Sequence, residues 1–147
     1  MYTYRRRTAP YPTFALLDAP SFELTCTGRS QTNTPLQALA LLNDPAFVEA
    51  AAGLARLVLA ELPEGTDEER IQLAFRRCTS RLPSAAELGV LGQLLTEQRE
   101  RFTADPQRAI ALAHSDFLPA AKDEIEVATW TLVANVLLNL DEVLTKQ

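Results

Sequence analysis

The chain has 147 residues, a length that forms one domain with a hydrophobic core of ordinary size. Hydrophobic residues make up 47% and charged residues 22%, with 5 Gly and 9 Pro, and this composition excludes a disordered, collagen-like or low-complexity chain. The net charge of -5 argues against a nucleic-acid partner, because an acidic chain lacks the positive field that attracts phosphate.

Residues 1–33 contain several prolines and no sustained helical or strand period, so they predict an irregular, extended wrap. Three arginines at Arg5–Arg7 stand among tyrosines, and we interpret this cluster as solvated or paired with a carboxylate. The basic start is followed by Pro10 and Pro12 rather than by an apolar run. The chain as written therefore shows no secretory signal and is expected to stay in the cytoplasm.

Residues 34–147 predict a helical array, because Ser, Thr or Asp caps recur with Pro at the first helical position or with Glu or Gln at the third. These starts are Thr34 with Pro35 and Gln37, Asp44 with Pro45, Thr66 with Glu69, Ser84 with Glu87, Asp105 with Pro106, and Asp123 with Glu126. The first helix is expected over 35–43, the second ends before Pro63 and Gly65, and the fifth ends near His114.

Apolar residues at helical spacing predict which side of each helix faces the core. They are Phe47, Ala51, Leu54, Ala55, Val58 and Leu62 in the second helix, Ile71, Ala74, Phe75 and Cys78 in the third, and Leu88, Leu91, Leu95 and Phe102 in the fourth. Connections between the helices are short, which favours helices packed as close neighbours.

The last helix, expected over about 124–145, is predicted to be the longest. It is apolar on nearly all sides between Val127 and Leu138, so we expect it to run through the middle of the bundle with Trp130 as its largest buried side chain. Its apolar stretch is too short and too polar to span a bilayer, so no membrane insertion is expected.

The predicted fold is therefore all-α: an irregular multi-helix bundle with an extended N-terminal wrap and a buried C-terminal helix. Residues 1–147 form a single helical unit, in which residues 1–33 are the wrap and residues 34–147 the helical array.

The densest polar cluster surrounds the first two helix starts. It comprises Thr32, Asn33, Thr34, Gln37, Asn43 and Asp44. One interpretation is structural, since the first N–H groups of a helix need side-chain partners. The other is a binding site, because two adjacent helix N-termini attract anions.

A second polar group lies on the last helix, where Asn135 and Asn139 are four residues apart and share a face, with Asp141 just beyond. We interpret these three residues as a structural hydrogen-bond network that holds another segment's backbone, for instance the wrap, because a buried amide without a partner is costly. A ligand is the alternative.

Other patterns of catalytic and metal sites are missing from the sequence. His114 is the only histidine, so a catalytic triad, a metal site or haem ligation would have to use it without recognisable partners. Cys26 and Cys78 stand far apart outside any CxxC motif, and whether they pair is left open. We predict no catalytic residue and no metal ligand in this chain.

Two separated phrases of sequence resemble the planctomycete-type domain of unknown function fifteen-fifty-three. The first phrase is Phe22–Cys26, Thr32–Leu39 and Leu42–Pro45, and the second is Trp130–Glu142. The resemblance implies that this region is the C-terminal part of a larger domain, so that Met1 is an internal start and the chain a fragment. Its implied partner is an upstream companion domain of the same parent protein, which in this family is exported and sometimes carries a cytochrome c module.

The resemblance also implies that the parent is located in the periplasm or at the cell surface, and that any haem is held outside this region, with no cofactor in this chain. It carries over no catalytic residues. The favoured hypothesis is a non-catalytic helical packing or interaction module of a larger cell-envelope, cytochrome-associated protein. The alternative is a fragment of an enzyme, whose substrate pocket includes Asn33–Asp44 and is completed by the missing upstream domain. The isolated fragment is also expected to be capable of dimerising.

Overall fold

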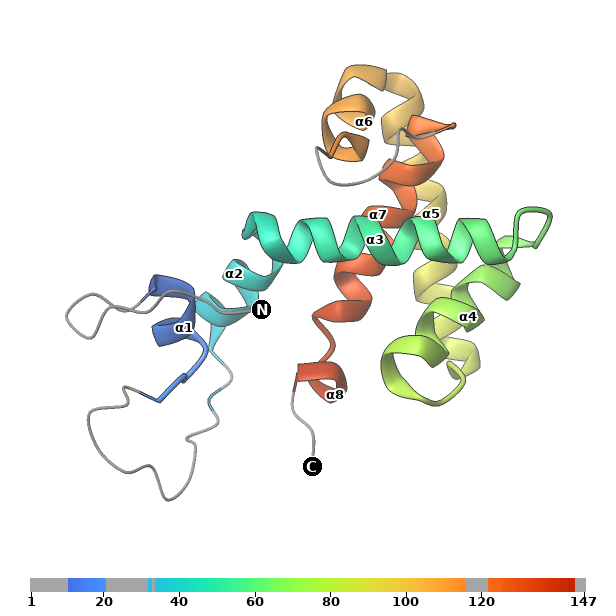
Figure 1. The fold of residues 1–147 in the computed structure, drawn as a ribbon. Helices are drawn as coiled ribbons and strands as arrows, with labels where there is room; N and C mark the ends of the chain where they lie inside the picture. Colours follow the sequence, from blue (N-terminus) through green and yellow to red (C-terminus); the bar gives the residue numbers. More distant parts are fainter. Residues whose placement is uncertain (1–10, 21–31, 33, 116–121, 145–147) are drawn as a thin grey trace.

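A computed structural model describes residues 11–20, 32, 34–115 and 122–144 (Figure 1). All regular elements of these residues are helices, which confirms the predicted all-α class. In chain order they are α1 (Pro12–Leu16), α2 (Pro35–Asn43), α3 (Pro45–Glu61), α4 (Asp67–Thr79), α5 (Ala85–Ala104), α6 (Pro106–Ala113), α7 (Glu124–Leu138) and α8 (Asp141–Leu144).

Side-chain caps begin most of these helices, as predicted. Three are full capping boxes, in which the cap hydroxyl accepts from the backbone N–H of the third helical residue and that residue's side chain accepts from the cap N–H. The three are Thr34 with Gln37, Thr66 with Glu69, and Ser84 with Glu87. Asp44 and Asp123 also accept a backbone hydrogen bond in the first turn of their helices. These interactions supply partners for N–H groups that the helix itself leaves unpaired.

Asp105 departs from the prediction, because its side chain makes no capping hydrogen bond to α6. Its carboxylate lies instead 3.9 Å from the guanidinium of Arg108. The start of α6 rests on Pro106, whose fixed φ suits the first helical position and whose missing N–H needs no partner there.

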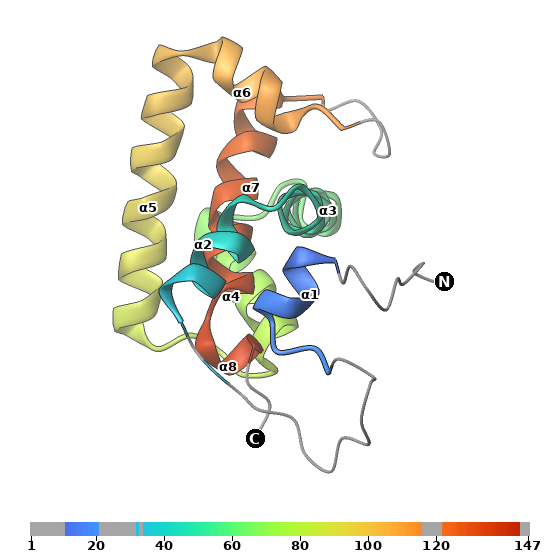
Figure 2. The same cartoon turned by 90° about the vertical axis from the view of Figure 1, so that its left-hand side faces the viewer.

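The core surrounds α7, as predicted. Figures 1 and 2 show α3 crossing α7 steeply while α5 runs alongside it, and α6 packs against the amino-terminal end of α7. Trp130, Val133 and Leu137 of α7 are almost completely buried in one apolar cluster. The other buried members of that cluster are Ala51, Ala55, Val58, Ile71, Ala74, Phe75, Leu91, Leu95 and Ala134. A second cluster joins α6 to the start of α7 and to Phe102 of α5.

The predicted length of the last helix is wrong. α7 ends at Leu138 and not near 145, and its 15 residues are fewer than the 20 of α5. The break is a tight turn, in which the backbone N–H of Leu140 donates to the carbonyl of Leu137. The carbonyl of Leu140 then accepts from Val143 and Leu144, which begins the short α8.

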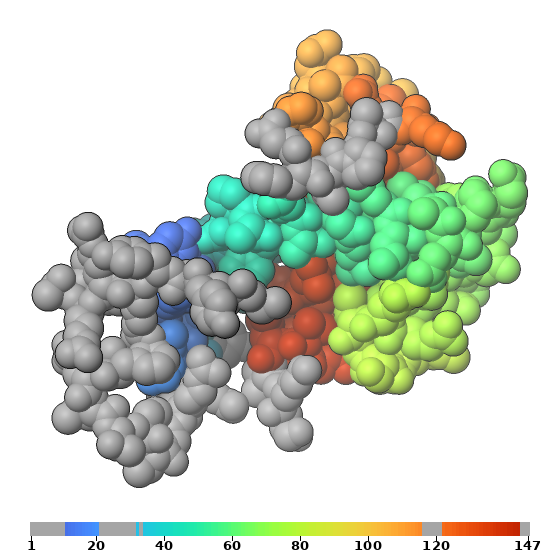
Figure 3. Space-filling model, viewed as in Figure 1, coloured from blue at the N-terminus to red at the C-terminus, as the bar shows by residue number. Residues whose placement is uncertain are grey.

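The N-terminal wrap also differs from the prediction in its described part, because Pro12–Leu16 form the helix α1 with Pro12 at the first position. The rings of Tyr11 and Phe14 meet edge to face, with their centroids 5.5 Å apart. Helix α1 packs against α2, and the two lie at the end of the molecule opposite α4 (Figure 3). Residues 1–10, 21–31 and 33 of the wrap, with Arg5–Arg7 and Cys26, lie outside the described residues.

No single helix in the described ranges is both long and apolar enough to cross a membrane. Helices α2 and α3 pass that test only when taken together, and they are bent by 60° at the break between them.

Candidate functional site

Gln37 is the centre of the polar cluster at the joint between α1 and α2. Its side chain is only 6% exposed, and its amide nitrogen donates to the carbonyl of Leu16 at 2.8 Å and to the hydroxyl of Thr32 at 2.8 Å. The same nitrogen lies 3.2 Å from Oδ2 of Asp18. Its amide oxygen accepts from the backbone N–H of Thr34 at 2.7 Å. This one amide therefore ties the segment after α1 to the first turn of α2.

Asp18 completes this cluster, and sequence reasoning had not singled it out. Its Oδ2 accepts from the backbone N–H of Thr32 at 2.9 Å and from the Thr32 hydroxyl at 2.6 Å. These two hydrogen bonds, with a smaller contribution from Gln37, lower the pKa of the Asp18 carboxyl below its ordinary value, so it is an anion at neutral pH. Its φ of 56° lies in the left-handed region, which Asp tolerates better than most residues.

Asp44 links α1 to the start of α3. Its Oδ1 accepts from the backbone N–H of Ala46 at 3.0 Å, and its Oδ2 accepts from the hydroxyl of Thr13 at 2.8 Å. Asn43 is exposed and donates from Nδ2 to the carbonyl of Leu39 on its own helix at 2.8 Å. We call Thr32, Asn33, Thr34, Gln37, Asn43 and Asp44 the cap cluster. Its described side chains are largely bonded to one another and to α1. Its remaining predicted member, Asn33, lies outside the described residues.

Asn135 of α7 is 6% exposed, and its Nδ2 donates to the carbonyl of Leu42 at 3.1 Å. The backbone held by this amide therefore belongs to the last turn of α2 rather than to the wrap. Asn139 stands at the end of α7, where its backbone N–H donates to the carbonyl of Asn135 at 3.2 Å, and Asp141 is the exposed first residue of α8.

Helix α2 has an inverted burial pattern. Its buried side chains are Gln37 and Leu41, whereas Leu36, Leu39 and Leu42 are 60%, 57% and 40% exposed. A short helix that packs on a core normally does the reverse, with its leucines inside and its amides in water. We call Leu36, Leu39 and Leu42 the leucine face of α2.

A second cluster, formed by charged side chains, joins α4, α5 and α7. No sequence pattern indicated it. The guanidinium of Arg99 contacts both oxygens of Asp67, at 2.9 and 3.1 Å, and both oxygens of Glu126, at 3.1 and 2.9 Å. Oε1 of Glu126 also accepts from Nε1 of Trp130 at 2.9 Å and lies 3.7 Å from Arg70. These hydrogen bonds to two carboxylates, Glu126 first, raise the pKa of Arg99 above its already high value. The cluster has the form of a structural joint between three helices.

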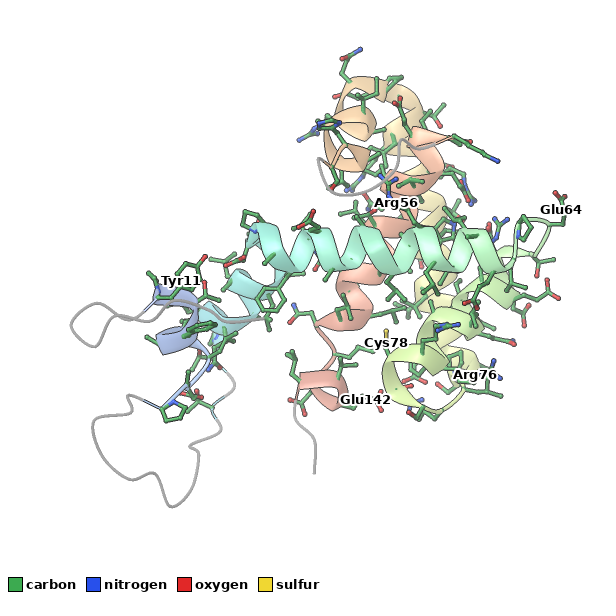
Figure 4. All side chains as sticks on the ribbon, viewed as in Figure 1. Tyr11, Arg56, Glu64, Arg76, Cys78 and Glu142 are labelled. Atoms are coloured by element: carbon green, nitrogen blue, oxygen red, sulfur yellow. The ribbon has the colours of Figure 1, made fainter. Side chains whose placement is uncertain are left out.

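A third cluster fastens α8 to the turn between α4 and α5. The guanidinium of Arg81 lies 4.6 Å from the ring centre of Phe75 and donates to Glu87 and to Glu142. The bonds from Arg81, and after them those from Ser84, lower the pKa of Glu87 to about 2. Cys78 lies on α4 (Figure 4) and packs against the main apolar cluster. It is half-buried, and burial raises the pKa of its thiol, which disfavours the reactive thiolate.

One groove of about 330 Å³ lies between α3 and α6. Its lining is Pro45, Val48, Glu49, Ala52, Ala111, Leu112, His114 and Ser115. The hydroxyl of Ser115 donates to Oε1 of Glu49 at 2.9 Å. His114 thus stands beside a polar pair that sequence reasoning missed, because Glu49 is far from Ser115 along the chain. In the described part of the chain, no group of three or more His, Cys, Asp or Glu side chains is arranged to hold a metal ion.

Comparison with known proteins identifies one family. The family model PSD1, described as "Protein of unknown function (DUF1553)", matches residues 1–95. These residues include the cap cluster, α2, α3 and α4, whereas the second phrase of the sequence resemblance, Trp130–Glu142, lies outside them. No curated protein and no solved structure matches the chain.

Proposed function

The chain belongs to the PSD1 family of proteins of unknown function (DUF1553), and from this premise we propose that it is a non-catalytic helical packing module of a larger protein. Its role is to dock on an upstream companion domain of the same parent through the leucine face of α2. The single observation that carries this proposal is the inverted burial of α2, in which Gln37 is inside while Leu36 and Leu39 are more than half exposed.

The energetics favour contact at this face. Burying a leucine side chain completely contributes about 1.5 to 3 kcal/mol. Leu36, Leu39 and Leu42 stand at intervals of three residues on one helix, so one partner surface is able to cover all of them. Exposed leucines scattered singly need no explanation, but a run of them on one short helix is typical of an interaction site.

Polar contacts determine the direction in which the leucine face of α2 points. Gln37 has its amide bonded to Leu16, Thr32 and Thr34 in the observed orientation of α2. Rotating α2 to bury its leucines would break those hydrogen bonds and leave buried polar groups without partners, at a cost of about 1 to 3 kcal/mol for each group. The cap cluster therefore keeps the leucines pointing outward.

The setting of the module is also part of the proposal. We place the parent in the cell envelope, associated with a cytochrome, and any haem outside this chain. The resemblance of the sequence to the family supports this setting. The side chains of Thr34, Gln37 and Asp44 are bonded to groups of the chain itself, which supports a structural rather than a catalytic role.

The test begins with the gene. The DNA before Met1 should continue in frame and encode the companion region, and a stop codon immediately upstream would contradict the proposal. The companion region and this chain, expressed separately, should then bind each other. The double variant Leu36→Ala/Leu39→Ala should weaken binding more than tenfold while the melting temperature stays unchanged, since both side chains are exposed.

Val90→Ala is the matched control, because Val90 is 68% exposed on α5 and lies outside the leucine face. It should bind like the unmodified chain. Equal binding by the leucine variant and the control would refute docking through α2.

A second candidate function is a fragment of an enzyme. The groove between α3 and α6 favours it, because this groove begins at Pro45, next to the cap cluster, and contains the Glu49–Ser115 pair. Under this hypothesis the upstream region completes the pocket. Substituting Asn33 and Asp44 with Ala should then abolish ligand binding by the full parent at an unchanged melting temperature, whereas a lower melting temperature alone would support a structural role.

A further inference from the structure

Helix α2 is attached to the bundle by polar bonds more than by the apolar core. Its buried side chains are Gln37 and Leu41, and neither of the two apolar clusters contains a described side chain of α2. Figure 1 shows α2 at the amino-terminal end of α3, on the side of α7 opposite α4. The direction of α2 therefore depends on the hydrogen bonds that hold its two ends.

The junction between α2 and α3 is one extended residue, Asp44, with φ -66° and ψ 129°. The two helices are bent by 60° across it. The N–H of Asp44 donates to the carbonyl of Ala40 in α2, whereas the carbonyl of Asp44 accepts from Phe47 and Val48 in α3. A backbone rotation at Asp44 therefore changes the angle of α2 without breaking either helix.

Asn135 of α7 holds the end of α2 that lies next to this junction. It is 6% exposed, and its Nδ2 donates to the carbonyl of Leu42 at 3.1 Å. The other buried polar side chains of α7, Thr129 and Thr131, donate to carbonyls of their own helix. The last carbonyls of a helix have no partner within it, so Leu42 is able to accept a bond from another helix. Asn135 thus uses its amide between helices.

This bond acts on the leucine face directly, because Leu42 belongs to that face. The carbonyl of Leu42 accepts from the buried amide of Asn135, whereas Leu42 as a whole is 40% exposed. Side chains on one helix keep fixed angles to each other, so Leu36 and Leu39 turn together with Leu42. The amide of Gln37 in the first turn is the second point at which α2 is held.

The apolar core alone does not account for an amide at position 135. Val133, Ala134 and Leu137 beside it on α7 all belong to the main apolar cluster. An aliphatic side chain at this position would add apolar burial, whereas an amide has to be taken out of water and given a partner. What the amide contributes is therefore its bond to α2.

We propose that Asn135 is a positioning residue for docking, which holds α2 at the angle at which the leucine face meets the companion domain. This inference rests on the proposed function and adds how the docking face is kept in place. Without the bond, α2 turns about Asp44 and presents the leucine face in the docking orientation for part of the time. The apparent affinity then falls by the fraction of molecules in that orientation.

The experiment measures binding between this chain and the separately expressed companion region by titration calorimetry. The key variant is Asn135→Leu, which removes the donor and keeps a side chain of similar size. It should bind about three- to tenfold more weakly, as expected for the loss of one hydrogen bond, at an unchanged melting temperature. Without the partner, hydrogen exchange should become faster for the amides of α2 and stay the same for those of α7. Asn135→Gln keeps an amide donor and should bind more tightly than Asn135→Leu.

Asn139→Leu is the matched control. Asn139 lies one turn further along α7 on the same face, and no hydrogen bond in the described part of the chain joins its side chain to α2. This variant should bind like the unmodified chain and leave exchange in α2 unchanged. If Asn135→Leu fails to fold, Asn135→Ala, which removes the donor without adding bulk, takes its place in the same measurements.

The outcomes separate the two proposals. If Leu36→Ala/Leu39→Ala abolishes binding while Asn135→Leu binds normally, the inference is wrong and the proposed function stands. If the leucine variant binds normally, the proposed function itself fails. If Asn135→Leu and Asn139→Leu weaken binding equally, or if exchange becomes faster throughout the bundle and not in α2 alone, Asn135 has a merely structural role and the inference is overturned.

Discussion

Gln37 shows how one side chain determines the orientation of a helix. This buried amide donates hydrogen bonds to Leu16 and to Thr32, which are separated by a long stretch of sequence. The spacing to Thr34 predicted its local role as a capping-box partner. Its contact with Leu16 was not predictable from spacing, because the two residues are brought together only when α1 packs on α2.

Replacing Gln37 with Leu should loosen this joint without unfolding the bundle. The substitution removes the side chain that binds both the carbonyl of Leu16 and the N–H of Thr34, which should cost about 1 to 3 kcal/mol locally. Hydrogen exchange should rise for the amides of α1 and the first turn of α2. Gln107→Leu, at an exposed position of α6, should leave these amides unchanged; equal protection in both variants would argue against the tie.

Glu87 gives a prediction for acid pH. Its pKa is lowered to about 2, first by Arg81 and then by Ser84, against an ordinary value near 4.5. A carboxylate with a lowered pKa stabilises the folded state fully above the ordinary value, and this contribution is lost as the pH falls toward the folded value. The contact of Arg81 with Glu87 should therefore weaken between about pH 4.5 and pH 2.

The measurement is a titration of the Glu87 carboxyl carbon followed by nuclear magnetic resonance. Its midpoint should lie well below the ordinary glutamate value of 4.5. A midpoint at that ordinary value would mean that the bonds from Arg81 do not persist in solution.

At the scale of the helices, local sequence determined where most elements begin. A cap and its partner lie three residues apart, so their chemistry is visible without any tertiary contact, and the starts of α2, α4 and α5 followed the prediction. The end of α7 did not, because apolar residues continue past Leu138 with helical spacing. Glu142 lies on the separate helix α8 and accepts hydrogen bonds from Arg81, which is in a distant part of the sequence.

The capping box of α4 is suited to a stability test. Thr66→Ala removes a hydroxyl that accepts from the backbone N–H of Glu69, and the substitution should lower the free energy of unfolding by about 1 kcal/mol. Urea unfolding measures this change. The control is Thr96→Ala, since the hydroxyl of Thr96 donates to the carbonyl of Gly92 within the middle of α5, where Ala is a better helix former. A similar loss in both variants would contradict a specific role of the cap.

At the scale of the whole molecule, ionic contacts join elements that local patterns treat separately. Arg99 of α5 binds Asp67 of α4 and Glu126 of α7, and these three residues are far apart in sequence. The periodic apolar stripes correctly predicted a core around α7, since hydrophobic contact is not directional. They carried no information about which charged side chains would meet at its edge.

Removing the guanidinium of Arg99 should destabilise the whole bundle. Arg99→Met leaves two carboxylates close together without their shared cation, and we expect a loss of about 1 to 3 kcal/mol in the free energy of unfolding, smaller at high salt. Arg108→Met is the control, because Arg108 is 81% exposed and its distance to Asp105 is 3.9 Å. It should change stability by less than about 0.5 kcal/mol. Equal effects of the two substitutions would show that the joint is not structural.

The burial of Trp130 has a practical consequence. It is the only tryptophan of the chain, it is 1% exposed, and its indole N–H donates to the same Glu126 oxygen that faces Arg99. Intrinsic fluorescence excited in the indole band therefore originates from a single interior chromophore beside the three-helix joint. Its emission should shift to longer wavelength only when water reaches that joint. Tryptophan fluorescence therefore follows opening of the bundle and does not respond to changes at the distant leucine face.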